Sequence, residues 1–111
     1  MNYSLDMQDI AVIVRVDGRV DESSWEAFGE GLSQAIRQAG QSGLARVIID
    51  LSNLDYMSSR GLRVLTVANR EADQAAIAVS LASPNEVMRE ILAISRYDKL
   101  FTITDTIEVK E

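Results

Sequence analysis

Residues 46–65 decide the fold, and they read RVIIDLSNLDYMSSRGLRVL. The segment from Arg46 to Leu51 is rich in β-branched side chains and apolar on both faces, which is typical of a central strand covered by other layers. A helical pattern begins near Ser58 and Ser59 and continues to about Asp73. This helix should bury Leu62, Leu65, Ala68 and Ala72. A strand, a polar connection and a helix in this order predict one unit of an α/β domain.

Four more strands are expected around this unit. Apolar residues alternate from about Ile10 to Val16, and the shorter segment Tyr3 to Met7 should pair with that strand as a hairpin. The segment Ala76 to Ala82 has the same apolar character as the central strand. A last short strand is expected at Phe101 to Ile103.

A helix should precede the central strand. Ser23 and Glu26 have the spacing of a capping box at its start, and Gly40 can end it. Gly29 and Gly31 each lower the stability of this helix by about 1 kcal/mol. We attribute the presence of these glycines to a close approach of helix and sheet. Its apolar stripe, at spacings of three and four, consists of Trp25, Phe28, Leu32, Ile36 and Ala39.

The last helix has the clearest start signals. Ser83 is a candidate N-cap, Pro84 suits the first turn, and Glu86 completes a capping box. The element order is therefore β-β-α-β-α-β-α-β, which predicts a small single α/β domain over residues 1–111 with a mostly parallel central sheet. The expected buried stripe of the last helix is Val87, Met88, Ile91, Leu92 and Ile94.

The composition narrows the possible chemistry. The 111 residues include no cysteine and no histidine, which removes the usual ligands of zinc, copper, haem and iron–sulfur clusters and the usual bases of serine and cysteine hydrolases. We expect no metal, no cofactor and no catalytic residue. Asp17, Asp21, Asp50 and Asp55 fit no calcium loop, and solvated turn carboxylates are the simpler interpretation. A hydrolase that uses Asp50 or Asp55 stays an alternative, without a recognisable paired-acid spacing to support it.

The charge argues against nucleic acid as a ligand. Seventeen acidic and eleven basic residues give a net charge of −6, and the resulting field repels phosphate backbones and anionic membrane surfaces. The longest apolar runs, such as Ile10 to Val14, are far shorter than the roughly 20 residues that span a bilayer. The start of the chain also lacks the basic and apolar blocks of a signal peptide, so the cytoplasm is the expected location.

Two polar segments follow predicted strands, from Asp17 to Asp21 and from Asp50 to Gly61. In parallel sheets, ligands and partners contact the loops at the carboxyl ends of strands. The second segment ends with Ser58 and Ser59 at a helix N-terminus, where free backbone N–H groups and the helix dipole favour negative charge. Ser58 is either an N-cap or a functional serine, and the residues alone leave both interpretations open.

Residues 47–65 resemble the signature of the STAS domain, the anti-sigma factor antagonist family: an apolar strand, Asp-Leu-Ser, a serine pair, and Gly-Leu at the start of an apolar helix. Gly18 to Asp21 is similar to the family's Gly-Glu-Leu-Asp, and Tyr97 to Phe101 is similar to its Leu-Asp-Lys-Leu-Phe. The similarity extends over essentially the whole chain in the expected order. It therefore implies a single, stand-alone STAS domain.

The resemblance implies a partner switch controlled by phosphorylation. The unmodified protein would bind an anti-sigma factor, often a serine kinase, and so free the sigma factor. Phosphorylation would end this binding, and a separate serine phosphatase would restore it. Carried over residue by residue, the acceptor is Ser59, with Ser58 as the second choice. Ser58 occupies a position often held by aspartate. Arg60 replaces a small residue. It either pairs with a phosphate on Ser59, pairs with the nucleotide in a kinase, or is a solvated side chain.

The resemblance also implies a partner surface that combines the two polar segments with the first turn of the second helix. Met57 is expected mainly in the core, close enough to this surface to add apolar area. Related stand-alone domains serve instead as scaffold subunits of phospholipid ABC transport complexes, which bind a transport ATPase constitutively, and this alternative stays open. The residues expected on the surface are Asp17, Gly18, Arg19, Asp21, Asn53, Met57, Ser58, Ser59, Arg60 and Arg63.

Overall fold

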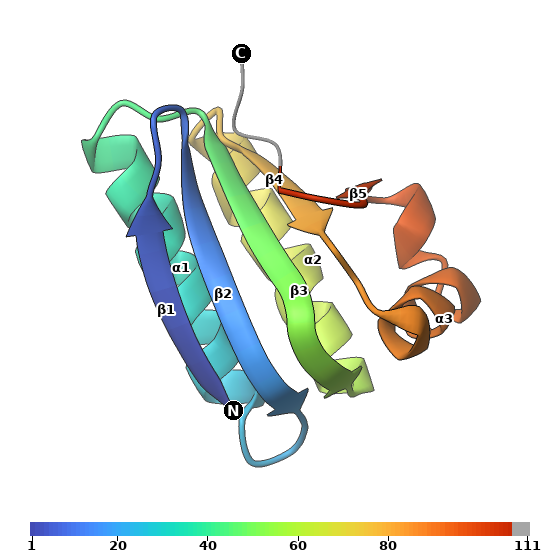
Figure 1. Cartoon of the computed structure of the whole chain (residues 1–111). Coiled ribbons are helices and arrows are strands. Elements are labelled where there is room, and N and C mark those ends of the chain that lie inside the picture. Colours follow the sequence, from blue (N-terminus) through green and yellow to red (C-terminus); the bar gives the residue numbers. More distant parts are fainter. Residues whose placement is uncertain (108–111) are drawn as a thin grey trace.

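The computed structural model describes residues 1–107, and its elements follow the predicted order (Figure 1). The five strands form one sheet in the order β1-β2-β3-β4-β5, in which β1 pairs antiparallel with β2 and the other pairs are parallel. The predicted small α/β domain with a mostly parallel sheet is therefore confirmed. The elements are β1 (Asn2–Met7), β2 (Ala11–Val20), α1 (Trp25–Gln41), β3 (Arg46–Met57), α2 (Ser59–Gln74), β4 (Ala78–Ala82), α3 (Glu86–Ile94), the 3-10 helix η1 (Tyr97–Lys99) and β5 (Thr102–Thr104).

The hydrophobic core lies between the sheet and the helices α1 and α2, which lie side by side against one of its faces (Figure 1). Alternate strand residues point into this core, as the period-2 pattern predicts. The buried residues of β2 and β3 include Val12, Val14, Val16, Val47, Ile49 and Leu51. The predicted helical positions that meet them are Phe28, Leu32, Ile36 and Ala39 of α1 and Leu62, Leu65, Ala68 and Ala72 of α2. Burying each large side chain contributes about 1.5–3 kcal/mol to folding.

The strands β2 and β3 are longer than predicted. They extend to Val20 and Met57, so most of the two polar segments is strand rather than loop. The register shifts between Arg15 and Asp17 and again between Gly18 and Arg19, where bulges absorb the extra residues. Polar residues have low strand propensity, but pairing between the two neighbouring backbones outweighs it here.

The start of α1 differs from the predicted capping box. The N-cap position belongs to Ser24, and Ser23 instead donates its hydroxyl to the Asp21 carboxylate at 2.8 Å. The buried Ser24 hydroxyl donates to the Arg19 carbonyl at 2.8 Å and accepts from the Asp21 backbone N–H at 2.9 Å. Trp25, predicted in the core stripe, is only partly buried at its edge. The hydrogen bonds of the two serines therefore stabilise the turn between β2 and α1 rather than the end of the helix.

The start of α3 was also predicted two residues too early. Ser83 has a left-handed φ of 58°, and the N-cap is Asn85, whose side-chain oxygen accepts from the Met88 N–H at 2.9 Å. The Asn85 amide also donates to the Leu54 carbonyl at 2.9 Å, so a contact with β3 selects this cap. Val87 and Ile94, predicted as buried, are 52% and 76% exposed. The face of α3 that meets the sheet is narrow, and Met88 and Leu92 fill it.

Two short strands begin later than predicted. β4 starts at Ala78, because Ala76 has a left-handed φ of 59° in the turn that follows α2. β5 starts at Thr102, because the Phe101 N–H is bonded to the Tyr97 carbonyl at 3.1 Å and belongs to the turn of η1. Local turns therefore shorten both strands at their N-terminal ends.

The two glycines inside α1 have different neighbours. A Cβ at Gly31 would lie 2.9 Å from a ring carbon of Tyr3 on β1, which confirms a close approach of helix and sheet. A Cβ at Gly29 would lie 3.7 Å from Val64 on α2, so the prediction of a helix–sheet contact was wrong there. Gly29 instead marks the contact between the two helices.

These neighbours predict opposite effects for two matched substitutions. Gly29→Ala should raise the free energy of unfolding by about 1 kcal/mol, because helix propensity improves and the methyl group meets only ordinary contacts. Gly31→Ala should lower it, because the methyl group displaces the Tyr3 ring. Thermal melts of the two variants beside the parent protein measure both effects. Equal shifts would contradict this account.

Candidate functional site

The carboxyl ends of β2 and β3 and the start of α2 meet at one edge of the sheet. Arg19 pairs with Tyr56 and Val20 with Met57, in parallel register. The Ser58 backbone N–H then donates to the Val20 carbonyl at 2.8 Å. This bond holds the first turn of α2 beside the turn that leaves β2, and it brings the two predicted polar segments together.

The two serines have separate roles in this first turn. Ser58 has an extended backbone at the N-cap, and its hydroxyl accepts from the Gly61 N–H at 3.3 Å. Ser59 is the first residue of α2 and is exposed. Its hydroxyl forms no hydrogen bond with any group of residues 1–107. The structure therefore assigns capping to Ser58 and leaves the Ser59 hydroxyl accessible.

The capping role of Ser58 predicts how its variants behave. Ser58→Ala should lower the free energy of unfolding by about 1 kcal/mol, because the Gly61 N–H loses its acceptor. Ser58→Asp should keep the stability of the parent, because aspartate caps well and its charge suits a helix N-terminus. Urea unfolding of both variants checks this pair. An unchanged free energy of unfolding for Ser58→Ala would exclude the capping role.

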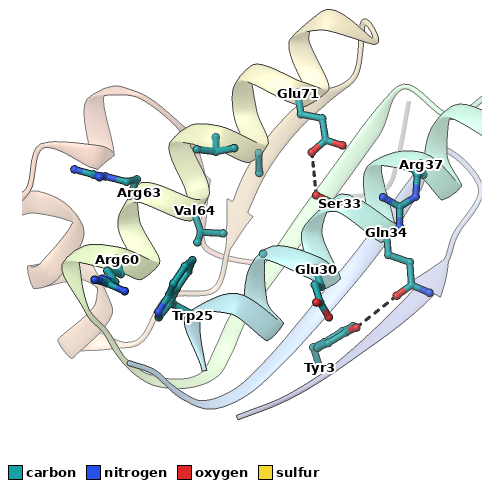
Figure 2. Close-up of a pocket in the computed structure, with 13 residues that line it drawn as sticks. Tyr3, Trp25, Glu30, Ser33, Gln34, Arg37, Arg60, Arg63, Val64 and Glu71 are labelled. Atoms are coloured by element: carbon teal, nitrogen blue, oxygen red, sulfur yellow. Dashed lines mark hydrogen bonds between the residues drawn. The ribbon is translucent and has the colours of Figure 1, made fainter. Parts of the chain in front are cut away.

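Two arginines form stacked contacts at this edge. The Arg60 guanidinium lies 5.2 Å from the Trp25 ring centre (Figure 2). The Arg60 Nε is 3.5 Å from the Glu22 carboxylate. The Arg19 guanidinium lies 4.5 Å from the ring centre of Tyr56. Such cation–π contacts contribute about 0.5–1 kcal/mol at exposed sites. Glu22, Trp25 and Tyr56 were not predicted at this edge, because no local spacing in the sequence signals a contact between separate elements.

The other residues predicted for the partner surface lie in different places. Arg63 is exposed on α2 and forms no ion pair within residues 1–107. Asp17 pairs with Asn53 farther back along the strands, where both side chains are exposed, and Gly18 has a φ of 93° that favours glycine. Met57 is only 2% exposed, so it belongs to the core as expected but adds no area to the surface.

Asp21 organises the turn between β2 and α1. Hydrogen bonds from the Ser23 hydroxyl and backbone N–H lower the pKa of the Asp21 carboxyl below its usual 3.8. A carboxyl with a lowered folded-state pKa stabilises the protein above its unfolded-state pKa, and this contribution is lost as the pH falls through the folded-state value.

The expected result is that Asp21→Asn unfolds more readily than the parent at pH 7. The difference between the two proteins should shrink at a pH below about 4, as the parent carboxyl becomes protonated. Thermal melts across this pH range provide the measurement. A difference that stays constant with pH would exclude the carboxylate charge as its cause.

The other aspartates have structural surroundings. The buried Asp50 carboxylate accepts from the Ser52 N–H at 3.0 Å and lies 3.7 Å from the Arg15 Nε, whereas Asp55 is exposed. Within residues 1–107, no three acidic side chains are grouped so that they could hold a metal ion. Among the described helices, none has the length and apolar character needed to cross a membrane.

Comparison with the sequences of known proteins shows relatives along nearly the whole chain. The sequence model of the STAS domain matches residues 3–109. BtrV of Bordetella bronchiseptica, assigned as an anti-sigma factor antagonist, is 28% identical over 97% of this chain and 90% of its own. A STAS-domain protein of Pseudomonas aeruginosa is 28% identical over 91% of this chain and 93% of its own.

Solved structures show the same fold. A protein of Thermotoga maritima, assigned as an anti-sigma factor antagonist, superposes with a TM-score of 0.81 at 20% identity, covering 95% of this chain and 87% of its own. The anti-sigma factor antagonist SpoIIAA in its unphosphorylated form superposes with a TM-score of 0.73 at 23% identity, covering 92% and 87%. The family match over nearly the whole sequence and the shared fold lead to one conclusion: this chain belongs to the STAS domain family.

Proposed function

We propose that this protein is an anti-sigma factor antagonist whose binding is switched by phosphorylation of Ser59. The exposed Ser59 hydroxyl at the start of α2 is the observation that carries the proposal, because the neighbouring Ser58 is engaged as the N-cap. The names of the BtrV and SpoIIAA relatives support the antagonist role. SpoIIAA has also been solved in a phosphorylated form, which supports a modification within the family.

The switch acts through charge in a buried interface. A phosphoserine carries about −1.5 to −2 charges and three acceptor oxygens. At the N-terminus of α2 the charge is tolerated by the fold, because the helix dipole and free N–H groups favour anions there. A partner that is fitted to a neutral hydroxyl must instead desolvate this charge. Phosphorylation therefore releases the partner without unfolding the antagonist.

The proposed partners follow from this chemistry. The unmodified surface, with Arg19, Ser59, Arg60 and Arg63, binds an anti-sigma factor of the serine kinase type, and a serine phosphatase reverses the modification. Both reactions use catalytic groups of the partner enzymes, which suits a chain without histidine or cysteine. We place the protein in the cytoplasm, where sigma factors act, and assign it no catalytic activity of its own.

Affinity purification from the native cells, with mapping of phosphorylated residues, tests the proposal. The expected result is recovery of a kinase-like anti-sigma factor with the unmodified protein, and phosphate on Ser59 in the fraction that lacks it. Constitutive recovery of a transport ATPase with an unmodified Ser59 would overturn the switch in favour of a scaffold role. Phosphate on Ser58 alone would overturn the choice of acceptor.

A further inference from the structure

A groove runs between α1 and α2, beside the surface that carries Ser59 (Figure 2). Its volume of about 820 Å³ lies in the range of small-molecule sites. Trp25 and Gly29 line it from α1, and Val64 and Val67 line it from α2. The groove adjoins the edge of the sheet where the proposed partner binds, and Arg60 and Arg63 belong to both.

The groove offers an apolar surface. Trp25 is only partly buried, and Val67 is 54% exposed although it is a large apolar side chain. Gly29 adds no side chain to the floor, and the nearest atom to its missing Cβ is a Val64 methyl group at 3.7 Å. An indole ring and exposed valine between two helices suit a flat apolar group, because stacking on an aromatic ring favours planar partners.

Charge is divided between the two ends of the groove. Arg60 and Arg63 lie at one end, whereas Glu30 and Glu71 lie toward the other with Arg37 (Figure 2). Arg63 has no ion-pair partner within residues 1–107, and Arg60 has a single carboxylate at 3.5 Å. On a chain with a net charge of −6, this end is locally cationic. An anionic group is therefore favoured there and disfavoured at the opposite end.

We propose that this groove binds an organic anion with a flat aromatic body. The body lies against Trp25 and Val67, and the anionic group meets the guanidinium groups of Arg60 and Arg63. Binding needs neither a protein partner nor phosphorylation, so the inference stands apart from the proposed function. An occupant that draws Arg60 away from Glu22 also changes the charge beside Ser59, which links the groove to the partner surface.

The single tryptophan of the chain provides the test, because all tryptophan fluorescence comes from Trp25. The probe is 8-anilinonaphthalene-1-sulfonate, an aromatic anion, and its neutral counterpart is N-phenyl-1-naphthylamine. We expect energy transfer from Trp25 to the bound sulfonate dye. The double variant Arg60→Gln/Arg63→Gln should lower the affinity for the sulfonate dye about tenfold or more and leave the affinity for the neutral dye unchanged. Arg70→Gln, an exposed arginine of α2 outside the groove, is the matched control and should have no effect.

A second pair of variants locates the dye. Val67→Glu places a carboxylate in the groove and should abolish binding of the sulfonate dye. Val87→Glu makes the same change at a similarly exposed valine of α3, outside the groove, and should leave binding intact. Both positions are exposed, so both variants should fold. Three results would overturn the proposal. The sulfonate dye could lose binding to Val87→Glu but not to Val67→Glu, or it could show no energy transfer from Trp25. The arginine double variant could also weaken binding of both dyes equally.

Discussion

Ser59→Asp should bind the anti-sigma factor a few hundred-fold more weakly than the parent protein. A carboxylate at this exposed position adds a charge that the interface must desolvate, and a loss of about 3–4 kcal/mol corresponds to that change in affinity. Ser59→Ala should bind like the parent, because it adds no charge that the interface must desolvate. Isothermal titration with the co-purified anti-sigma factor measures all three affinities.

Ser4→Asp is the matched control, since it adds the same charge at an exposed serine on β1. It should bind like the parent, which separates a local effect at Ser59 from a general effect of net charge. All four proteins should have similar melting temperatures, because both substituted positions are exposed. Equal affinities of Ser59→Asp and Ser59→Ala would exclude the switch at this residue.

Gly61→Ala should be the most destabilising conservative change in the first turn of α2. A Cβ at this position would lie 2.5 Å from the Met57 Cγ and 2.7 Å from a Val20 methyl group. Both neighbours are buried at the ends of β2 and β3, so the helix start must shift away from the sheet. Overpacking of this kind costs about 1–3 kcal/mol, which lowers the melting temperature of a domain of this size by roughly 4–8 °C per kcal/mol.

Gly29→Ala is the control for this prediction, because it adds the same methyl group to a helix where space is available. The double variant Gly61→Ala/Met57→Ala tests the cause. Removing the Met57 side chain relieves the closer contact, so the added methyl group should cost less in that background than in the parent. Additive losses in a double-mutant cycle would show that Met57 is not the obstacle.

Periodicity predicted the main helices and strands and most of the positions that they bury. The stripe of α2 and the alternation of β2 were readable because both follow from local geometry. The sequence did not show which of several neighbouring polar residues caps a helix. Asn85 caps α3 in place of Ser83 because its amide also reaches the Leu54 carbonyl on β3, a contact between elements that lie far apart in the sequence.

The same limit applied to the candidate site. The serine pair, the glycine and the apolar helix lie close together in the sequence, so their spacing carried the prediction. The contacts of Arg60 with Trp25 and Glu22 join segments more than thirty residues apart, and no pattern in the sequence marks them. Met57 was predicted mainly in the core, close enough to the partner surface to add apolar area. It is only 2% exposed, so the core position is confirmed and the added surface area is not.

The order of strands in the sheet is the order of strands in the chain, and this has a consequence for synthesis. Each strand after the first leaves the ribosome when its neighbour in the sheet has already been made, with at most one α-helix between them. The hairpin of β1 and β2 closes first, and each later βα unit extends its free edge. No strand has to be inserted between two others, so each free edge of β2, β3 and β4 is covered once the next strand has been made. Paired strands are therefore as close in the sequence as their connections allow, which favours faster folding than the same parallel sheet with its strands in another order.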